Sequence, residues 1–411
     1  MHKKIGVCPK FSMRRIELNF KLKKPILACG ADMKGAFALG SGAQVFQYEG
    51  FGDLSDPDNL ARYRKAIAGA LKTTRIKPAI VACDMHPEYF STRFAENYRK
   101  IGTTKNLKNR SFGSPLQGSP QDDRENRSLS LFFIQHHEAH IAAAIIDNAI
   151  KGDCVGVAFD GTGYGLDGNI WGGEFFVGGL KGFKRAAHLE YVPMPGGDAA
   201  IREPWRMAVS YLGKIGTDTY FYQTRRGGLN LLYGNFNMKN RCLSLFSMIE
   251  KRINSPLTSS AGRLFDAAAS MVLGRGTADF EAELPIAFEK ITDQNCDESY
   301  GAVLPSASAV IIKRVADDVS KKVDAGVISA RFHNTVAGMI TLTVKKLCKQ
   351  YRTKKIILSG GVFQNKFLSG KTAEMLRVDG FSVYMHKDVS TTDSGIPVGQ
   401  IAIANARFLC A

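Results

Sequence analysis

Apolar and polar positions follow two similar series along this chain. In the first, apolar segments at 25–29, 35–39 and 43–48 are separated by glycine-containing turns, and a helical pattern at 59–71, a strand at 79–84 and a helix near 92–100 come next. In the second, segments at 154–159, 170–177 and 183–191 precede long helical patterns at 309–322 and 336–351 and a strand at 355–358. Short apolar runs bounded by turn residues predict strands, and longer runs with a period of 3.6 predict helices.

The two series share one further feature, an aspartate shortly after the first strand of each, at Asp32 and Asp160. This order resembles the duplicated α/β fold of actin, sugar kinases and heat-shock ATPases, in which two halves hold a nucleotide between them. We therefore expect a tail at 1–24, a first half at 25–150 and a second half at 151–411. Residues 102–128 are polar and rich in Gly, Pro, Ser and Asn, which predicts a mobile loop. Residues 201–297 are predicted to form a helical insertion that packs on the second half and caps the cleft.

Candidate chemistry begins with the run His136-His137-Glu138-Ala139-His140, which opens a predicted helix. His136 and His140 are four residues apart, so they lie one turn apart on one helix face and can share a metal ion. A lone pair with this spacing also arises by chance.

The second candidate is Asp160-Gly161-Thr162-Gly163-Tyr164-Gly165, after the apolar segment 155–159. It predicts a strand that ends in a glycine turn, where backbone N–H groups can approach a phosphate. Alone, such a run more often marks a simple tight turn. Together with the histidine pair it favours nucleotide chemistry.

Composition narrows the class of protein. The chain has 411 residues, 45% hydrophobic and 23% charged, as in a globular protein of two or three domains. It has no apolar run long enough for a membrane span and no secretory pattern at its start, so we expect a cytoplasmic protein. The eight cysteines include no CxxC pair, which disfavours a zinc ribbon and a disulfide framework. The net charge of +17 is spread along the chain without an aromatic-interleaved stripe, so a nucleic-acid partner is not favoured.

Seven motifs then follow one another in an order that resembles one family. They are HHEAH, FDGTGYG, IWGGEFF, PMPGGDAAIREPWRMA, TSSAGRLFDA, ARFHNT and LSGGVFQN. Together they closely resemble the C-terminal carbamoyltransferase module of HypF, a maturation protein of nickel–iron hydrogenases, from about Pro25 to Phe408.

The resemblance implies a reaction. HypF proteins use carbamoyl phosphate and ATP to make a carbamoyl adenylate and pass the carbamoyl group to the C-terminal cysteine thiolate of HypE. The module would perform the transfer, with ATP or carbamoyl adenylate as its nucleotide and a HypE-like protein as its acceptor.

The resemblance also implies site residues. The metal ligands would be His136, His140, Asp160 and Asp393, a mixed nitrogen and oxygen set that suits zinc or iron, with magnesium as a further option. Gly161, Thr162, Gly163 and Tyr164 would hold phosphates. The adenosine would face Gly360, Gly361, Gln364 and Asn365, and also Gly196, Gly197 and Asp198, whose carboxylate suits a ribose hydroxyl.

Four further residues are candidates for catalysis, and each has a structural alternative: Lys34, Arg263, Asp266 and His333. Lys34 reaches phosphates or the carbamoyl group, or is a solvated turn lysine. His333 lines the pocket or is a hydrogen-bonded core histidine. Arg263 and Asp266 form an internal ion pair or, as we favour, hold an anion beside Ser259 and Ser260. His137 is expected to be a packing neighbour rather than a ligand.

The chain departs from the family pattern in extent and in detail. The resemblance covers only the C-terminal module of HypF, so we expect the acylphosphatase, zinc-finger-like and YrdC-like domains to be missing, and Met13-Arg14-Arg15 resembles the end of the YrdC-like domain. We therefore expect a separate adenylate-forming partner. Three single residues also differ from the family pattern: Glu138 replaces a histidine, Leu166 replaces an acidic residue, and Ser394 replaces a glycine.

Three hypotheses follow. The first is a transferase acting on a protein thiol, and the second is an O-carbamoyltransferase acting on a small molecule. The third is a nucleotide-binding subunit or a relative of the TsaD factor that makes threonylcarbamoyladenosine in tRNA, for which tight, salt-sensitive tRNA binding would be diagnostic.

Overall fold

The computed structural model describes residues 12–101, 129–215 and 236–409. The predicted mobile loop at 102–128 lies outside these residues. The chain divides into two compact units. The first contains the residues up to 151, residues 180–182 and those from 386 onward, and the second contains 152–179 and 183–385.

Six strands of the described chain form the sheet of the first unit, in the order β1-β4-β3-β2-β5-β6. Strands β2, β3 and β4 make the predicted antiparallel meander, and β5 and β6 add to β2 in parallel. The elements of this unit are β1 (Ser12–Glu17), β2 (Ile26–Ala28), β3 (Ala36–Ser41), β4 (Gln44–Glu49), α1 (Pro57–Thr74), β5 (Ile80–Asp84), α2 (Phe90–Ile101), β6 (Ser130–Ile134), α3 (His136–Asp147), η3 (Asp393–Gly395) and α14 (Ile396–Phe408).

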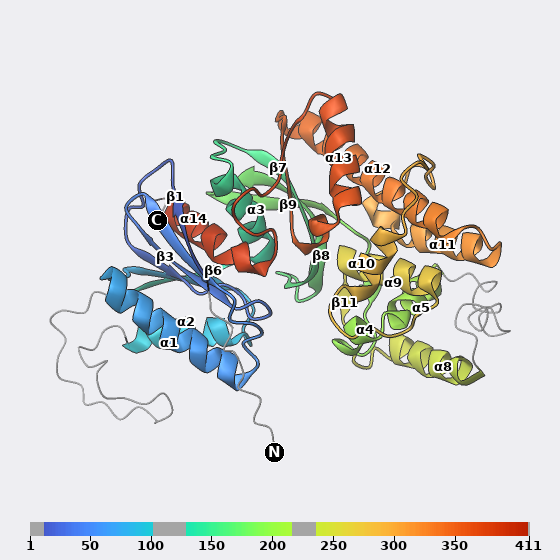
Figure 1. The fold of residues 1–411 in the computed structure, drawn as a ribbon, viewed down its shortest axis with the longest axis horizontal. Coiled ribbons are helices and arrows are strands. Elements are labelled where there is room, and N and C mark those ends of the chain that lie inside the picture. Colours follow the sequence, from blue (N-terminus) through green and yellow to red (C-terminus); the bar gives the residue numbers. More distant parts are fainter. Residues whose placement is uncertain (1–11, 102–128, 216–235, 410–411) are drawn as a thin grey trace, which may run out of the picture. The chain divides into compact units, whose positions relative to one another are not determined.

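Each face of this sheet is covered by helices (Figure 1). Alternate strand residues such as Leu27, Cys29 and Val81 pack with α1 and α2 in one hydrophobic core. The opposite face, which includes Gly40, packs against α14, and α14 in turn packs on α3. Because side chains of a strand alternate between faces, the short apolar run of β2 serves both layers.

Two features differ from the division expected from the sequence. Residues 12–17, expected to be part of a tail, form β1, which pairs with β4 along its whole length. The carboxyl-terminal helix α14, expected in the second half, belongs to the first unit, because its apolar side chains pack on β2, β3, β5 and α3.

The second unit repeats the meander. Strands β7, β8 and β9 are consecutive neighbours, β12 pairs with β7 in parallel and β13 with β12, while β10 and β11 extend the sheet beside β8. Its described elements are β7 (Cys154–Tyr164), β8 (Ile170–Gly179), β9 (Gly182–His188), β10 (Val192–Pro193), α4 (Ala199–Arg202), α5 (Trp205–Lys214), α8 (Phe236–Glu250), β11 (Leu257–Thr258), α9 (Ala261–Leu273), α10 (Glu283–Lys290), η1 (Pro305–Ala307), α11 (Ala309–Ser320), α12 (Ala325–Tyr351), β12 (Lys355–Ser359), η2 (Gly361–Gln364), α13 (Lys366–Val378) and β13 (Ser382–Tyr384). The two sheets confirm the predicted duplicated fold.

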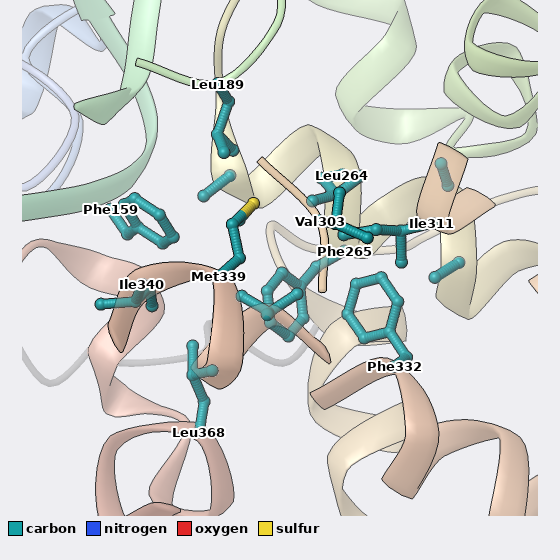
Figure 2. Close-up of a cluster of buried hydrophobic side chains, with 14 of the residues drawn as sticks. Phe159, Leu189, Leu264, Phe265, Val303, Ile311, Phe332, Met339, Ile340 and Leu368 are labelled. Carbon is teal, nitrogen blue, oxygen red and sulfur yellow. The ribbon is translucent and has the colours of Figure 1, made fainter. Parts of the chain in front are cut away.

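A large hydrophobic core joins the sheet and helices of this unit (Figure 2), and a smaller cluster joins α5 to α8. Phe159 of β7, Phe265 of α9 and Phe332 of α12 are all buried within it. Helices α5 and α9, from the predicted insertion, therefore pack into the same core as the sheet and are not a separate layer.

Candidate metal and nucleotide site

Helix α3 positions the two candidate histidines of the first unit. The side chain of Gln135 caps the helix by accepting the backbone N–H of Glu138, and the helix then continues to Asp147. His136 and His140 lie one turn apart with ring centroids separated by 5.0 Å, and both side chains are buried. The helix thus brings together the pair that its spacing predicted.

Asp393 reaches the same place from the other end of the chain. Its Oδ1 lies 3.6 Å from Nε2 of His136 and 3.5 Å from Nε2 of His140. These distances are too long for hydrogen bonds. They suit ligands of one cation, because two atoms each about 2.05 Å from a tetrahedral metal lie roughly 3.3 Å apart. The donors of the three residues lie within 4.8 Å of one another, so this part of the first unit fits a metal ion.

Asp84, which the sequence did not single out, fixes the orientation of His136. Its Oδ2 lies 2.8 Å from Nδ1 of His136, and both side chains are buried. The carboxylate accepts a hydrogen bond from Nδ1–H of His136, which selects the tautomer whose Nε2 carries the lone pair on the side of Asp393. Asp84 ends β5, beside the parallel strand β6 that leads into α3. The polar residue at the end of a buried strand was the signal that could have found it.

His137 and Glu138 have other partners. Nδ1 of His137 lies 3.2 Å from the side-chain nitrogen of Gln135, next to the helix cap. The carboxylate of Glu138 pairs with Arg407 of α14. Burial raises the pKa of Glu138, and the arginine opposes that effect. Glu138 therefore ties α3 to α14.

The first aspartate and the first-half lysine lie in the turn after β2. Asp32 accepts the backbone N–H groups of Phe90 and Ser91, so it caps α2. Lys34 is exposed in the same turn. Its geometry fits the solvated turn lysine, and a role at a phosphate stays a prediction.

In the second unit, the glycine run lies inside a hairpin rather than in a turn directly after the strand. Strand β7 continues to Tyr164, with a shift of register against β8 between Phe159 and Gly163. The chain reverses at Gly165, whose N–H donates to the carbonyl of Asn169. The expected turn is therefore displaced toward the carboxyl end, and residues 160–162 form an irregular stretch of strand with backbone groups outside the regular ladder.

Arg185, another residue that sequence reasoning missed, braces this hairpin. Its guanidinium lies 3.8 Å from the ring centroid of Trp171, its Nε lies 2.5 Å from the buried carboxylate of Glu174, and its Nη1 lies 3.3 Å from Asp167. The indole N–H of Trp171 also donates to Asp167. Stacking and charge pairing together hold the reversal in one conformation.

Two glycines after β12 contact the irregular stretch of β7. Gly360 has φ of +99°, and a Cβ on it would lie 2.2 Å from the carbonyl oxygen of Phe159, so only glycine fits. The N–H of Gly361 donates to Oδ1 of Asp160 at 3.1 Å. The second unit thus brings Asp160, Gly161, Gly360 and Gly361 together.

Arg263 and Asp266 form a buried ion pair on α9, with Nε and Oδ2 2.8 Å apart. Burial raises the pKa of Asp266 to about 6, and the pairing with Arg263 opposes the rise. The pair is nevertheless close to the hairpin, because a Cβ at Gly161 would lie 3.8 Å from Nη2 of Arg263. Ser260, which caps α9, also bonds the carbonyl groups of Asp160 and Gly161. The structure thus shows the internal ion pair, and a role of Arg263 in holding an anion stays a prediction.

His333 lies in the core, as its alternative reading proposed. It is surrounded by Phe265, Phe288, Phe332 and Phe367, with ring centroids 5.4 to 5.6 Å away. Its Nδ1 is 2.8 Å from the carbonyl oxygen of Ser329 and its Nε2 is 2.9 Å from the side-chain nitrogen of Asn365. Burial lowers its pKa to about 4. These bonds use both ring nitrogens, so the geometry favours a structural role.

Asn365 is committed in the same way, because its Oδ1 caps α13 by accepting the N–H of Leu368. The side chain of Gln364 donates to the carbonyl of Gly361. Gly196 and Gly197 have φ of +91° and +55° in a tight turn before α4, and Asp198 is exposed there. Contacts of these residues with a nucleotide stay predictions.

The described cysteines include several buried thiols, as the sequence predicted for Cys29 and Cys154. Burial raises the pKa of each of these two thiols to about 12, which disfavours a thiolate. Cys410 lies outside the described residues. No helix among the described residues is long and apolar enough to cross a membrane.

Comparison with known proteins agrees with this geometry. Residues 21–147 match the HypF Kae1-like domain, and residues 156–400 match the second subdomain of the Kae1-like carbamoyltransferase domain. A carbamoyltransferase HypF homolog of Cupriavidus necator is 29% identical over 392 residues, which cover 92% of this chain and 91% of that protein. Carbamoyltransferase HypF of Synechocystis is 28% identical over 417 residues, 97% of this chain and 50% of that protein.

The solved structures give the same result. Full-length HypF in its phosphate- and nucleotide-bound form matches with a TM-score of 0.81 and 30% identity, over 95% of this chain and 47% of that one. HypF of T. kodakarensis matches with a TM-score of 0.80 and 24% identity, which supports the fold. The chain spans about half the length of these two proteins and of the Synechocystis relative. With both subdomains matched, the chain belongs to the HypF carbamoyltransferase family, of which it carries the Kae1-like module.

Proposed function

We propose that this protein transfers a carbamoyl group from a carbamoyl adenylate to the C-terminal cysteine thiolate of a HypE-like protein during hydrogenase maturation. The observation that carries the proposal is the coincidence of the family match with a ligand cluster, His136, His140 and Asp393, that sits in the first unit at metal-ligand spacing.

The metal would be held by His136, His140 and Asp393, with Asp160 as the fourth ligand that the family resemblance implies. Two imidazoles and carboxylates favour zinc or iron over magnesium, which prefers oxygen ligands. When bound, the cation supplies positive charge that offsets negative charge on the phosphate oxygens of the leaving nucleotide. Asp84 keeps His136 in the tautomer that such a site needs.

The nucleotide would bind to the second unit. Backbone N–H groups of residues 161–164 would bind phosphates, and the adenosine would face Gly360 and Gly361, which pack against β7. Arg263, although paired with Asp266, would face such a phosphate from beside Gly161, where the carboxylate of Glu281 also lies. The exposed carboxylate of Asp198 would accept a ribose hydroxyl.

The transfer itself needs little acid–base chemistry. The acceptor thiolate forms a bond to the carbamoyl carbon, and the bond from that carbon to the phosphate oxygen breaks. AMP leaves with the electron pair, and the acceptor keeps a thiocarbamate. Because a thiolate is already a good nucleophile, the chain itself has to supply only binding, orientation and charge stabilisation.

Mass spectrometry tests the proposal directly. The purified chain is incubated with preformed carbamoyl adenylate and HypE, and HypE is then weighed. We expect a gain of one carbamoyl group, which would show that the adenylate-forming partner can be separate. If HypE gains no mass while a full-length HypF modifies it under the same conditions, the protein-thiol acceptor is wrong, and a small-molecule hydroxyl becomes the acceptor to test.

Variants of the histidine cluster test the metal assignment in the same assay. We expect His136→Ala and Asp393→Ala each to remove bound metal and transfer, because each deletes one ligand. His137→Ala, which changes the neighbouring buried histidine on the same helix, is the matched control and should retain most metal. Equal loss of metal in all three variants would contradict the assignment.

A further inference from the structure

The two ends of α3 contact different parts of the first unit. His136 and His140 stand at its amino-terminal end, and Asp147 is its last residue. A helix rises about 1.5 Å per residue, so Asp147 lies roughly 16 Å along the helix from His136. Asp147 is thus too remote to be a ligand.

Asp147 instead holds the segment that leads to Asp393. Its carboxylate lies 2.5 Å from the backbone nitrogen of Lys387, 3.1 Å from that of Asp388 and 3.2 Å from that of Val389. Three consecutive N–H groups directed at one carboxylate form a small anion-binding nest. The bonds join positions about 240 residues apart in sequence, within the first unit.

From this anchor the chain runs to Asp393 with little freedom. Val389 is buried, and the hydroxyls of Ser390 and Thr392 lie 2.9 Å apart. The buried Gln47 of β4 donates to the carbonyl of Ser394 at 2.7 Å. A Cβ at Gly395 would lie 2.1 Å from the carbonyl oxygen of Ser390, so the segment folds back closely on itself. The segment is therefore held at both of its ends.

We propose that Asp147 is a positioning residue that sets where Asp393 stands relative to His136 and His140. One rigid helix would thereby fix two ligands directly and the third through the segment 387–393. This inference rests on the metal site of the proposed function and adds a residue that none of the motifs contains.

The chemistry requires a carboxylate at this position. Its two oxygens offer about four lone-pair sites, enough for three N–H donors, and its charge strengthens each bond. An asparagine keeps the size but has one acceptor oxygen, and its NH₂ group would face N–H donors. Asp147→Asn therefore loosens the segment without removing volume.

The effect of Asp147→Asn on the metal site is measured as the affinity for zinc. Apo protein is titrated with Zn²⁺ against a chromophoric chelator, and we expect Asp147→Asn to weaken binding about tenfold, as changes in residues that orient metal ligands do. Asp388→Asn, the same chemical change at an exposed side chain of the same segment, is the matched control and should bind as the wild type does.

The same substitution in a protein that lacks the Asp393 carboxylate distinguishes positioning of Asp393 from general destabilisation of the fold. If Asp147 acts through Asp393, Asp147→Asn should cause no further loss of zinc affinity in an Asp393→Asn protein, in which the two imidazoles remain. An equal further loss there would overturn the inference, as would unchanged affinity of the single variant. A wild-type protein that binds no Zn²⁺ and no Fe²⁺ would instead contradict the metal site of the proposed function, and the inference with it.

Discussion

Hydrogen-bond partners decide the state of His333 more firmly than its motif does. A carbonyl oxygen can only accept, so Nδ1 must donate to Ser329, and the amide nitrogen of Asn365 can only donate, so Nε2 must accept. Both bonds are satisfied only in the neutral ring. A general acid or base at this position would have to break one of these two hydrogen bonds. A structural histidine can keep both.

The same bonds predict a pH dependence of stability. Burial lowers the pKa of His333 from 6.5 to about 4, so the folded protein resists protonation that the unfolded chain accepts. The contribution of neutral His333 to the free energy of unfolding is complete above about pH 6.5. It is lost as the pH falls toward 4, by about 3 kcal/mol in total. Urea unfolding measured across this range should show a shallower decline for His333→Asn than for the wild type. Parallel profiles would contradict the neutral, buried assignment.

The spacing of Arg263 and Asp266 along the sequence does not decide what these two side chains contact. Two residues three apart on a helix can pair with each other or face a ligand together. The structure shows the pair and, next to it, Gly161 of the hairpin. The packing of α9 against β7 places this ion pair beside Gly161, and the spacing of the two residues alone does not predict that neighbour.

At the level of secondary-structure elements, the close packing of α14 on α3 determines where α3 lies. A Cβ at Gly399 would lie 1.9 Å from the carbonyl oxygen of Ala139, so the two helices approach at this glycine. Arg407 and Glu138 add a charged contact between the same two helices. The position of α3, and with it the histidine pair, therefore depends on a helix at the opposite end of the sequence.

Substitution of Gly399 tests this close approach. Gly399→Ala should lower the free energy of unfolding by about 2 kcal/mol, because the methyl group overlaps backbone and the helices must separate. Gly69→Ala in α1 is the matched control, since nothing lies within 4 Å of its added Cβ and alanine is the better helix former. Chemical denaturation compares the two variants. Equal stability of both would mean that the helices adjust without cost.

For the molecule as a whole, chain order and spatial grouping differ. Asp393 and α14 come last in the sequence but belong to the unit built mainly from the first 151 residues. The side chain of Gln400 bonds both the N–H and the carbonyl of Gly30, which ties the two ends of the chain together inside that unit. The first unit is therefore incomplete until α14 has been made.

A truncation makes this dependence measurable. A chain that stops after Gly395 keeps His136, His140 and Asp393 but loses α14, which exposes one apolar face of the first sheet. We expect little soluble protein and no zinc binding. A chain that stops after Phe408 retains all of α14 and is the control. Zinc binding by the shorter chain at wild-type affinity would show that α14 is dispensable for the site.

The sequence by itself determined the duplicated strand order, the pairing of His136 and His140, and the family. These are local or repetitive properties: periodicity reports which side of a strand or helix is buried, and a spacing of four residues fixes a helix face. Tertiary structure alone decided that β1 joins the first sheet, that the hairpin reverses at Gly165, and that Asp84 orients His136. It also decided that α14 packs on α3 and that Asp147 bonds the backbone of residues 387–389, ahead of Asp393. Each of these depends on contacts between residues distant in sequence, and no local pattern of apolar and polar positions records which distant surfaces will meet.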